Sequence, residues 1–307
     1  MVNQKRLRQQ ALWAGLLILI ITGVAHPRKP VWTGVDRVVA IGDVHGDYEQ
    51  FVKTLRAAEV IDEQNKWIGG KMHLVQTGDV LDRGPDSRQA MDLLINLEVQ
   101  ALKAGGRVHA LIGNHEAMVL HRDLRYVHPG EYASYGGKAS YLRALGADGK
   151  YGKWIVRHNA IIKINDVLFL HGGIGPRYAT MPLEEINETI RQELKQPGGP
   201  KKSISTNSEG PLWYRGFARK AEDEIEELLK TVFKTHGVKR IVVGHTVSKG
   251  GIRMRSGGRV IMIDVGMSKC YGGPAGCLTI ENDKYYAVYP ESRQELVVGK
   301  EVVKTKE

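Results

Sequence analysis

Short apolar segments recur along the chain, and each ends at a glycine with a polar side chain beside it. These segments span residues 38–41, 72–77, 108–112, 167–170 and 241–243. A short run of apolar and β-branched residues that stops at glycine is typical of a buried β-strand. We therefore expect five core strands, each followed by a loop that displays a polar residue.

Helical periodicity occupies several of the intervals between these segments. Apolar residues recur every three or four positions in residues 48–59, 87–104, 183–194 and 221–234, which predicts four amphipathic helices. In the second of these helices the predicted buried face comprises Ala90, Met91, Leu94, Leu97, Ala101 and Leu102. Alternation of strands and helices indicates an α/β fold with the strand ends aligned at one edge.

One stretch, residues 119–154, lacks this regularity and is rich in tyrosine and glycine. We interpret it as a helical insertion. It either shapes access to a site at the strand ends or forms a packed subdomain without substrate contact. A second irregular stretch, residues 196–211, is rich in Pro, Gly and Ser and is expected to be a loop.

The composition is that of a globular body. Of the 307 residues, 42% are hydrophobic and 25% charged, which excludes a body that is disordered or spans a membrane. The formal net charge of +10 favours anionic partners, and it does not distinguish phosphorylated substrates from a lipid headgroup surface or nucleic acid. Because no run of Lys and Arg alternates with aromatic residues, we expect no nucleic-acid partner.

The first 26 residues differ from the body. Lys5, Arg6 and Arg8 precede an uncharged apolar run at residues 11–25. A run of about fifteen residues suits the core of a signal peptide better than a membrane span of roughly twenty. We expect residues 1–26 to be a signal peptide or an N-terminal membrane anchor, and the protein to be exported, periplasmic or anchored facing outside the cytoplasm.

The rest of the chain is expected to hold one catalytic domain at residues 31–295 and an exposed charged tail at residues 296–307. Cys270 and Cys277 flank a turn-like segment. In an oxidising compartment they would close a small disulfide, and two buried free thiols are an equal alternative. The pattern carries no signal for an oligomeric state.

Candidate chemistry lies at the strand ends. Asp43 and His45 follow the first strand with Gly42 and Gly46 on either side, so that a sharp turn would let both reach one metal ion. An isolated pair of this kind would equally be a capping Asp and an incidental His. The later strand ends add four further metal-competent residues: Asp79, Asn114, His171 and His245.

Six candidate ligands exceed what a single metal ion with an open position requires. Two divalent ions about 3.5–4 Å apart, bridged by one carboxylate, would use all six. Asp79 is the expected bridge because its segment lies between the two groups of ligands. Oxygen and nitrogen ligands without thiolate suit Mn, Fe or Zn better than Ca.

Over residues 38–246 these motifs resemble the signature of the phosphoprotein phosphatase branch of the calcineurin-like metallophosphoesterases. The sequence at residues 67–70, 73–79, 124–127 and 264–268 is similar to that of the Shewanella-like, bacterial-type protein phosphatases. The resemblance implies a sandwich of two mixed β-sheets flanked by helices, with a helical insertion, and a dimetal phosphomonoesterase activity.

The resemblance also implies roles for the ligands. Asp43, His45 and Asp79 would hold the first metal ion. The second would be held by Asp79, Asn114, His171 and His245. Manganese is the expected metal, with iron or zinc as alternatives, and a hydroxide bound to the metals would attack phosphorus in line with the leaving oxygen.

Further roles follow from the same resemblance. Arg83 and Arg215 would clamp the phosphoryl oxygens, because guanidinium groups suit phosphate and stabilise charge in the transition state. His115 would protonate the leaving oxygen, oriented by Asp82. Glu116 is expected to have a structural hydrogen-bonding role.

The substrate stays open at this stage. Residues 264–268 replace the Ser-Ala-Pro-Asn-Tyr segment of the eukaryotic serine/threonine phosphatases, so phosphotyrosine, phosphoserine and phosphothreonine are all candidates in a protein or peptide substrate. Tyr271 would line the substrate entrance or pack on the sheet. The alternatives are a hydrolase resembling the symmetrical dinucleoside tetraphosphatases, and a non-catalytic, membrane-tethered binding protein. The binding protein would predict a missing ligand or acid, and none is missing.

Overall fold

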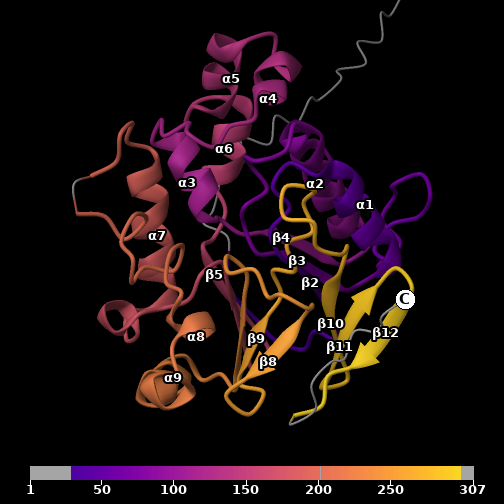
Figure 1. The fold of residues 1–307 in the computed structure, drawn as a ribbon, viewed down its shortest axis with the longest axis vertical. Coiled ribbons are helices and arrows are strands. Elements are labelled where there is room, and N and C mark those ends of the chain that lie inside the picture. Colours follow the sequence, from indigo (N-terminus) through magenta and orange to yellow (C-terminus); the bar gives the residue numbers. More distant parts are fainter. Residues whose placement is uncertain (1–28, 201, 299–307) are drawn as a thin grey trace, which may run out of the picture.

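The computed structural model of the chain describes residues 29–200 and 202–298, and two six-stranded sheets form its centre. The first sheet has the strand order β1-β5-β6-β7-β9-β8, and the second has the order β12-β11-β10-β2-β3-β4. Helices lie outside the two sheets (Figure 1). The expected sandwich of two mixed sheets flanked by helices is therefore confirmed.

In the second sheet, β2, β3 and β4 are parallel, and three antiparallel strands extend the sheet from β2. Its strands are β2 (Arg37–Ile41), β3 (His73–Gln76), β4 (Arg107–Ala110), β10 (Cys277–Glu281), β11 (Lys284–Tyr289) and β12 (Ser292–Glu295). Apart from residues 37, 280 and 281, the side chains of β2, β3 and β10 are buried.

In the first sheet, β6, β7 and β9 are parallel to one another. Its strands are β1 (Val31–Trp32), β5 (Ile161–Ile164), β6 (Val167–Leu170), β7 (Arg240–Val243), β8 (Arg253–Arg255) and β9 (Val260–Met262). The five strands expected from the apolar segments correspond to β2, β3, β4, β6 and β7. All five belong to the parallel parts of the two sheets.

The four expected helices are present, with ends within two residues of the prediction. They are α1 (Tyr48–Ala57), α2 (Ser87–Lys103), α7 (Leu183–Leu194) and α9 (Glu222–His236), and α8 (Gly216–Arg219) precedes the last. Helices α1 and α2 lie on the side of the second sheet, and α7, α8 and α9 on the side of the first (Figure 1). The prediction for Leu102 is wrong, since its side chain is 57% exposed. It follows the buried Ala101 by about 100° of rotation, which turns it from the sheet toward solvent.

The irregular stretch is a helical insertion, as expected. It follows α3 (Asn114–Leu120) and holds α4 (Pro129–Ser134), α5 (Lys138–Leu145) and α6 (Lys150–Val156), which stand above the sheets (Figure 1). Tyr141, Leu145 and Trp154 bury their side chains in the hydrophobic core. A short 3₁₀ helix, Pro176–Tyr178, precedes α7.

Both cysteines are free thiols. Cys277 is buried at the start of β10, where burial raises the pKa of its thiol to about 12, and Cys270 is exposed. Neither the disulfide nor the pair of buried thiols is therefore found. Leu296 is buried at the end of the described chain, followed by the exposed Val297 and Val298.

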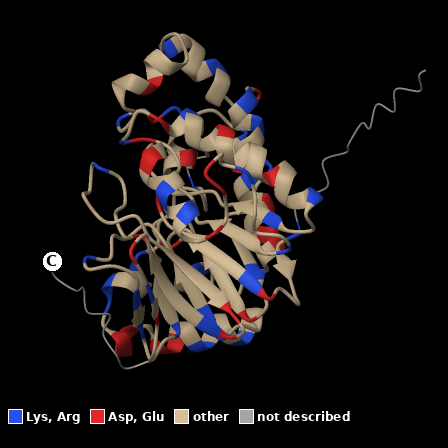
Figure 2. Ribbon diagram, turned by 90° about the vertical axis from the view of Figure 1, so that its right-hand side faces the viewer, with Lys and Arg blue, Asp and Glu red and all other residues tan. Residues whose placement is uncertain are grey.

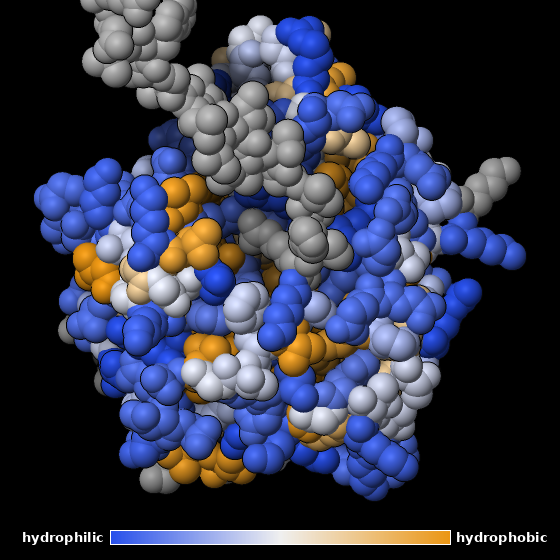
Figure 3. Space-filling view, turned by 180° about the vertical axis from the view of Figure 1, so that it is seen from behind, coloured by the Kyte–Doolittle hydropathy of each residue, from blue (hydrophilic) through white to orange (hydrophobic). Residues whose placement is uncertain are grey.

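The expected signal peptide or anchor (1–26) and residues 299–307 of the expected tail lie outside the described residues. Within residues 29–200 and 202–298, no helix combines the length and the hydrophobicity needed to cross a bilayer. On the face drawn in Figure 3, hydrophilic residues surround several separate hydrophobic patches.

Candidate metal centre and active site

The carboxyl ends of five strands, three from the second sheet and two from the first, deliver polar residues to one place. Asp43, Asp79 and Asn114 follow β2, β3 and β4 of the second sheet. His171 and His245 follow β6 and β7 of the first. All are buried, so the six predicted ligands, including His45, come together in the interior between the sheet ends. Their role as ligands stays a prediction.

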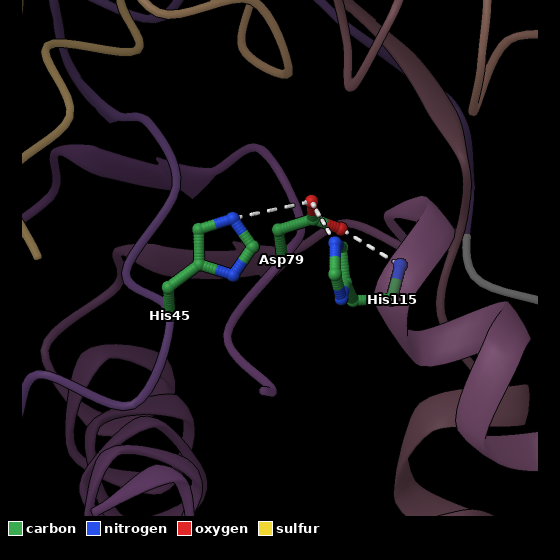
Figure 4. A group of neighbouring side chains, drawn as sticks. All are labelled: His45, Asp79 and His115. Atoms are coloured by element: carbon green, nitrogen blue, oxygen red, sulfur yellow. Dashed lines mark hydrogen bonds and ion pairs between the residues drawn. The ribbon is translucent and has the colours of Figure 1, made fainter. Parts of the chain in front are cut away.

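Asp79 is at the centre of the cluster. Its Oδ2 atom lies 3.7 Å from Nε2 of His45, which in turn lies 3.8 Å from Oδ2 of Asp43. Figure 4 shows His45 and His115 on either side of the Asp79 carboxylate. These three residues place ligand atoms within 4.8 Å of one another, close enough to surround one ion.

The second group shares the same carboxylate oxygen. Nε2 of His171 lies 3.2 Å from Oδ2 of Asp79, 2.8 Å from Oδ1 of Asn114 and 3.1 Å from Nδ1 of His245. Asp79 thus contacts a histidine of each predicted ligand group. This is the position required of a bridging carboxylate.

Backbone carbonyls orient two of the imidazoles. Nδ1 of His45 lies 3.0 Å from the carbonyl oxygen of Leu81, and Nδ1 of His171 lies 3.0 Å from that of Thr77. A carbonyl only accepts hydrogen bonds, so each Nδ1 carries the proton and each Nε2 presents its lone pair to the cluster. This carbonyl–imidazole arrangement is typical of metal-binding histidines.

The electrostatics of the cluster fit bound cations. Burial lowers the pKa of His45 to about 4 and that of His245 to about 2, so both imidazoles are neutral, as ligands must be. Burial and the charges of Asp264 and Asp79 raise the pKa of Asp43 well above its usual value. The neutral imidazoles do not compensate the negative charge of the buried carboxylates, and two divalent ions would do so.

When bound, such ions polarise phosphoryl oxygens and activate water as a nucleophile. The described residues that would hold them are Asp43, His45, Asp79, Asn114, His171 and His245. Oxygen and nitrogen donors of this kind fit Mn, Fe or Zn.

The backbone of the site is unusual. His45, Asp79 and His245 have positive φ angles of 46°, 56° and 62°, and Asp82 and Arg83 have φ of 69° and 70°. Non-glycine residues rarely adopt this left-handed conformation, and it is concentrated at functional sites because it costs energy. The surrounding contacts must therefore impose it.

Glu116 supplies part of that constraint. Its two carboxylate oxygens accept hydrogen bonds from the backbone N–H groups of Asp79, Val80, Leu81 and Gly113 at 2.8–3.2 Å. One buried side chain thereby holds the loop after β3 against the loop after β4. The expected structural role of Glu116 is confirmed.

Close glycine packing supplies another part. A Cβ atom on Gly84 would lie 2.5 Å from the carbonyl oxygen of Gly46 and 2.7 Å from that of His45. Real Cβ atoms do not come this close to backbone, so only glycine fits. The loops that carry His45 and Arg83 nest directly on each other as a result.

His115 lies beside the ligands and contacts Asp82, with Nδ1 of the imidazole 2.6 Å from the carboxylate. Burial alone would lower the pKa of His115, but the negative charges of Asp79, Asp82 and Glu116 outweigh burial and raise it. An imidazole that retains its proton near neutral pH can donate it to a leaving oxygen.

Both predicted phosphate-binding arginines are partly buried at this site. The guanidinium of Arg83 stacks on the ring of Tyr126, 3.9 Å from the ring centroid. Arg215 donates hydrogen bonds to the carbonyl oxygen of His245 and, at 2.9 Å, to Oγ1 of Thr246. Arg83 thus belongs to the loop after β3, whereas Arg215, at the start of α8, contacts the loop that carries His245.

A row of four rings lines the site. The centroids of Tyr271 and His45 are 5.5 Å apart, those of His45 and His115 4.7 Å, and those of His115 and Tyr126 5.3 Å. Tyr271 is 42% exposed and lies at the outer end of the row, in agreement with a place at the entrance.

Two residues of the site carried no predicted role. Asp264 follows β9, and its charge raises the pKa of Asp43. The apolar residues 260–263 precede it, so the sequence pattern that located the other strand-end residues could also have located Asp264. Tyr126 belongs to the insertion, where no periodic pattern indicated a ring beneath Arg83.

Comparison with known proteins identifies the family. The sequence profile of the calcineurin-like phosphoesterase family matches residues 36–249. The chain belongs to this family. Shewanella-like protein phosphatase 1 of Plasmodium berghei is 31% identical over 84% of the chain and 74% of its own length. Shewanella-like protein phosphatase 2 of Arabidopsis thaliana is 29% identical over 81% of the chain and 76% of its own length.

A solved structure also matches most of the chain. The cold-active protein-tyrosine phosphatase of a psychrophilic Shewanella species has a TM-score of 0.78 and 33% identity, covering 89% of the chain and 83% of that protein. The resemblance to the Shewanella-like phosphatases inferred from the motifs is confirmed. The chain is a metal-dependent hydrolase of the protein phosphatase type.

Proposed function

We propose that the protein removes phosphate from phosphoproteins and prefers phosphotyrosine. The observation that supports this preference most strongly is a row of rings in the predicted metal centre. The row is formed by Tyr271, His45, His115 and Tyr126. Aromatic rings contact one another favourably edge to face or offset, so this row would favour an aryl ester over a serine or threonine ester. The Shewanella protein with 33% identity, described as a protein-tyrosine phosphatase, supports the same preference.

The side chains divide the work of catalysis. Arg83 and Arg215 would bind the phosphoryl oxygens from two sides and stabilise the charge that grows there in the transition state. His115 would donate its proton to the phenolic oxygen as the P–O bond breaks. Asp82, bonded to the far side of the imidazole, holds that ring in orientation and favours its protonated form.

We infer that manganese is the preferred metal and that iron or zinc can replace it. The donor set of carboxylates, an amide and imidazoles supports this choice, because no thiolate is present to favour softer ions. Metal-stripped protein should regain activity with Mn, Fe or Zn at about two ions per chain, and metal analysis of the reconstituted protein would check the stoichiometry.

We also infer that the protein acts outside the cytoplasm, as a periplasmic or membrane-anchored enzyme. The support is the basic start and the apolar run at residues 11–25. Cell fractionation of a C-terminally tagged chain, with sequencing of its mature N-terminus, would test this inference. A cytoplasmic product that retains its initiator methionine would contradict it.

The deciding experiment compares phosphate release from peptides that differ only in the phosphorylated residue. The protein, from residue 27 onward, is stripped of metal and resupplied with Mn. We expect metal-dependent release from all peptides and a higher kcat/KM for phosphotyrosine. Equal or higher kcat/KM for phosphoserine or phosphothreonine would overturn the preference. Cleavage of a dinucleoside polyphosphate without release from any peptide would overturn the protein-phosphatase function.

A further inference from the structure

An open groove of about 870 Å³ runs along the helical insertion, outside the metal-ligand cluster. It is formed by residues that follow α3, by α5 and the turn after it, and by residues that follow α7. The residues used below are Arg122, Leu124, Lys138, Leu142, Arg143 and Lys195. We propose that this groove binds acidic residues that flank the phosphorylated residue of the substrate, an inference that rests on the proposed protein phosphatase function.

The charge of the groove is strongly one-sided. Arg122, Lys138, Arg143 and Lys195 line it against a single acidic residue, Asp148, and all five are exposed. Figure 2 shows that Lys and Arg residues, with some Asp and Glu, lie on the helices that stand above the sheets. A surface with this excess of positive charge attracts acidic segments and orients them as they approach.

These four cations make few close contacts with acidic groups, although Lys195 lies near enough to Glu188 to lower the pKa of that carboxyl. Within residues 29–200 and 202–298, none of them forms an ion pair with a carboxylate. Arg122 donates instead to the carbonyl oxygen of Leu142 at 3.0 Å, and Arg143 donates to Oγ of Ser140 at 2.8 Å. The groove therefore presents positive charge that is not held in a close ion pair among the described residues, and that carboxylates of a partner can approach.

Other cations in and beside the insertion behave differently. Lys150 pairs with Asp92 at 2.7 Å, and Arg157 pairs with Glu98 at 2.8 Å. Both pairs tie α6 to α2, and neither cation lines the groove. The contrast indicates that the groove cations do not serve to attach the insertion to the body of the protein.

The groove is close to the active site along the chain. Leu124 lines it, and Tyr126, only two residues later, lies under the guanidinium of Arg83. Two residues span at most about 7 Å. A peptide whose phosphoryl group contacts Arg83 would therefore place residues a few positions away in the groove. The apolar side chains of the groove, among them Leu124 and Leu142, would contact the backbone and the aliphatic parts of the peptide, while the cations bind its carboxylates.

The test uses matched phosphotyrosine peptides that carry three Asp or three Asn about three to six residues from the phosphotyrosine, on either side. The variant K138Q/R143Q/K195Q removes three groove charges and leaves Arg122, whose hydrogen bond joins α3 to α5. The matched control, K66Q/K103Q/K234Q, removes the same charge at exposed positions away from the groove.

For the unaltered protein we expect a KM roughly fivefold lower for the Asp peptide on one side of the phosphotyrosine, with equal kcat. High salt should abolish the difference because the charges are exposed to solvent. For the groove variant, the KM of the Asp peptide should rise to that of the Asn peptide. The control variant should keep the lower KM for the Asp peptide. Neither variant should change turnover of para-nitrophenyl phosphate.

Equal KM values for Asp and Asn peptides on both sides, or the same loss in the control variant, would overturn the groove proposal alone. Turnover of para-nitrophenyl phosphate without turnover of any peptide would instead overturn the protein phosphatase function on which the groove rests.

Discussion

Nδ1 of His115 lies 2.6 Å from Oδ2 of Asp82, and both side chains are buried at the edge of the predicted metal centre. The contact leaves Nε2 of the imidazole 3.8 Å from the carboxylate of Asp79. His115 is therefore placed to donate a proton, but it also lies close enough to the cluster to be a ligand. Activity and metal content together separate the two roles.

We predict that His115→Asn lowers kcat about 10²–10⁴-fold for substrates with a poor leaving group and far less for a nitrophenyl ester, which needs little protonation. Both metal ions should remain bound, as checked by elemental analysis. Asp82→Asn should cause a smaller loss of the same kind. Loss of one metal ion in the His115 variant would show that His115 is a ligand.

The stack of Arg83 on Tyr126 leads to a second prediction. Because a cation–π contact contributes about 0.5–2 kcal/mol, Tyr126→Ala should lower kcat/KM roughly 3- to 30-fold. Tyr126→Phe keeps the ring and should retain nearly all activity. Steady-state kinetics with a small aryl phosphate measures both. If the Phe variant were as impaired as the Ala variant, the hydroxyl and not the ring would matter.

The clustering of the predicted ligands at the strand ends was predictable from the sequence because each strand, its loop and the polar residue are contiguous. An apolar run followed by glycine and a polar residue locates Asp43 or His171 without knowledge of the rest of the fold. The parallel arrangement then brings such residues to one edge. The helices were equally accessible, and the error at Leu102 came from assigning one residue too many to a buried face.

Long-range and conformational features were not predictable in this way. The ring of Tyr126 reaches Arg83 from an insertion whose sequence has no regular period. The left-handed backbone of Asp79 and Arg83 depends on contacts with loops distant in the sequence, and no local propensity signals it. The groove cations are scattered over more than 70 positions, from Arg122 to Lys195, and only the fold gathers them.

The contact between Gly84 and Gly46 leads to a third prediction. Gly84→Ala would place a Cβ atom 2.5–2.7 Å from the backbone of Gly46 and His45, so the His45 loop must move. We expect loss of metal affinity and of activity by at least about tenfold, since displaced ligands bind poorly. Gly136→Ala is the control, because its Cβ meets nothing within 4 Å, although its positive φ costs about 1 kcal/mol. Equal metal affinity in both variants would contradict this account.

Glu131 leads to the last prediction, which concerns stability and pH. Its buried carboxylate, on α4, accepts the backbone N–H of Ser87 at the start of α2. Burial raises the pKa of Glu131 from 4.5 to about 7, although the N–H donors oppose the shift. The folded protein thus keeps this carboxyl protonated at pH values where the unfolded chain has already ionised it.

The sign follows from that difference. The stabilisation by Glu131 is complete below pH 4.5 and is lost as the pH rises to about 7, by up to about 3 kcal/mol in the free energy of unfolding. Glu131→Gln, which cannot ionise, should not show this loss. Urea unfolding of both proteins at pH 4.5 and 7.5, under identical metal conditions, gives the change in the free energy of unfolding between the two pH values. The difference between the two proteins in this change is the double difference. A double difference near zero would mean that the carboxyl is solvated, and that α4 does not close over the start of α2 in solution.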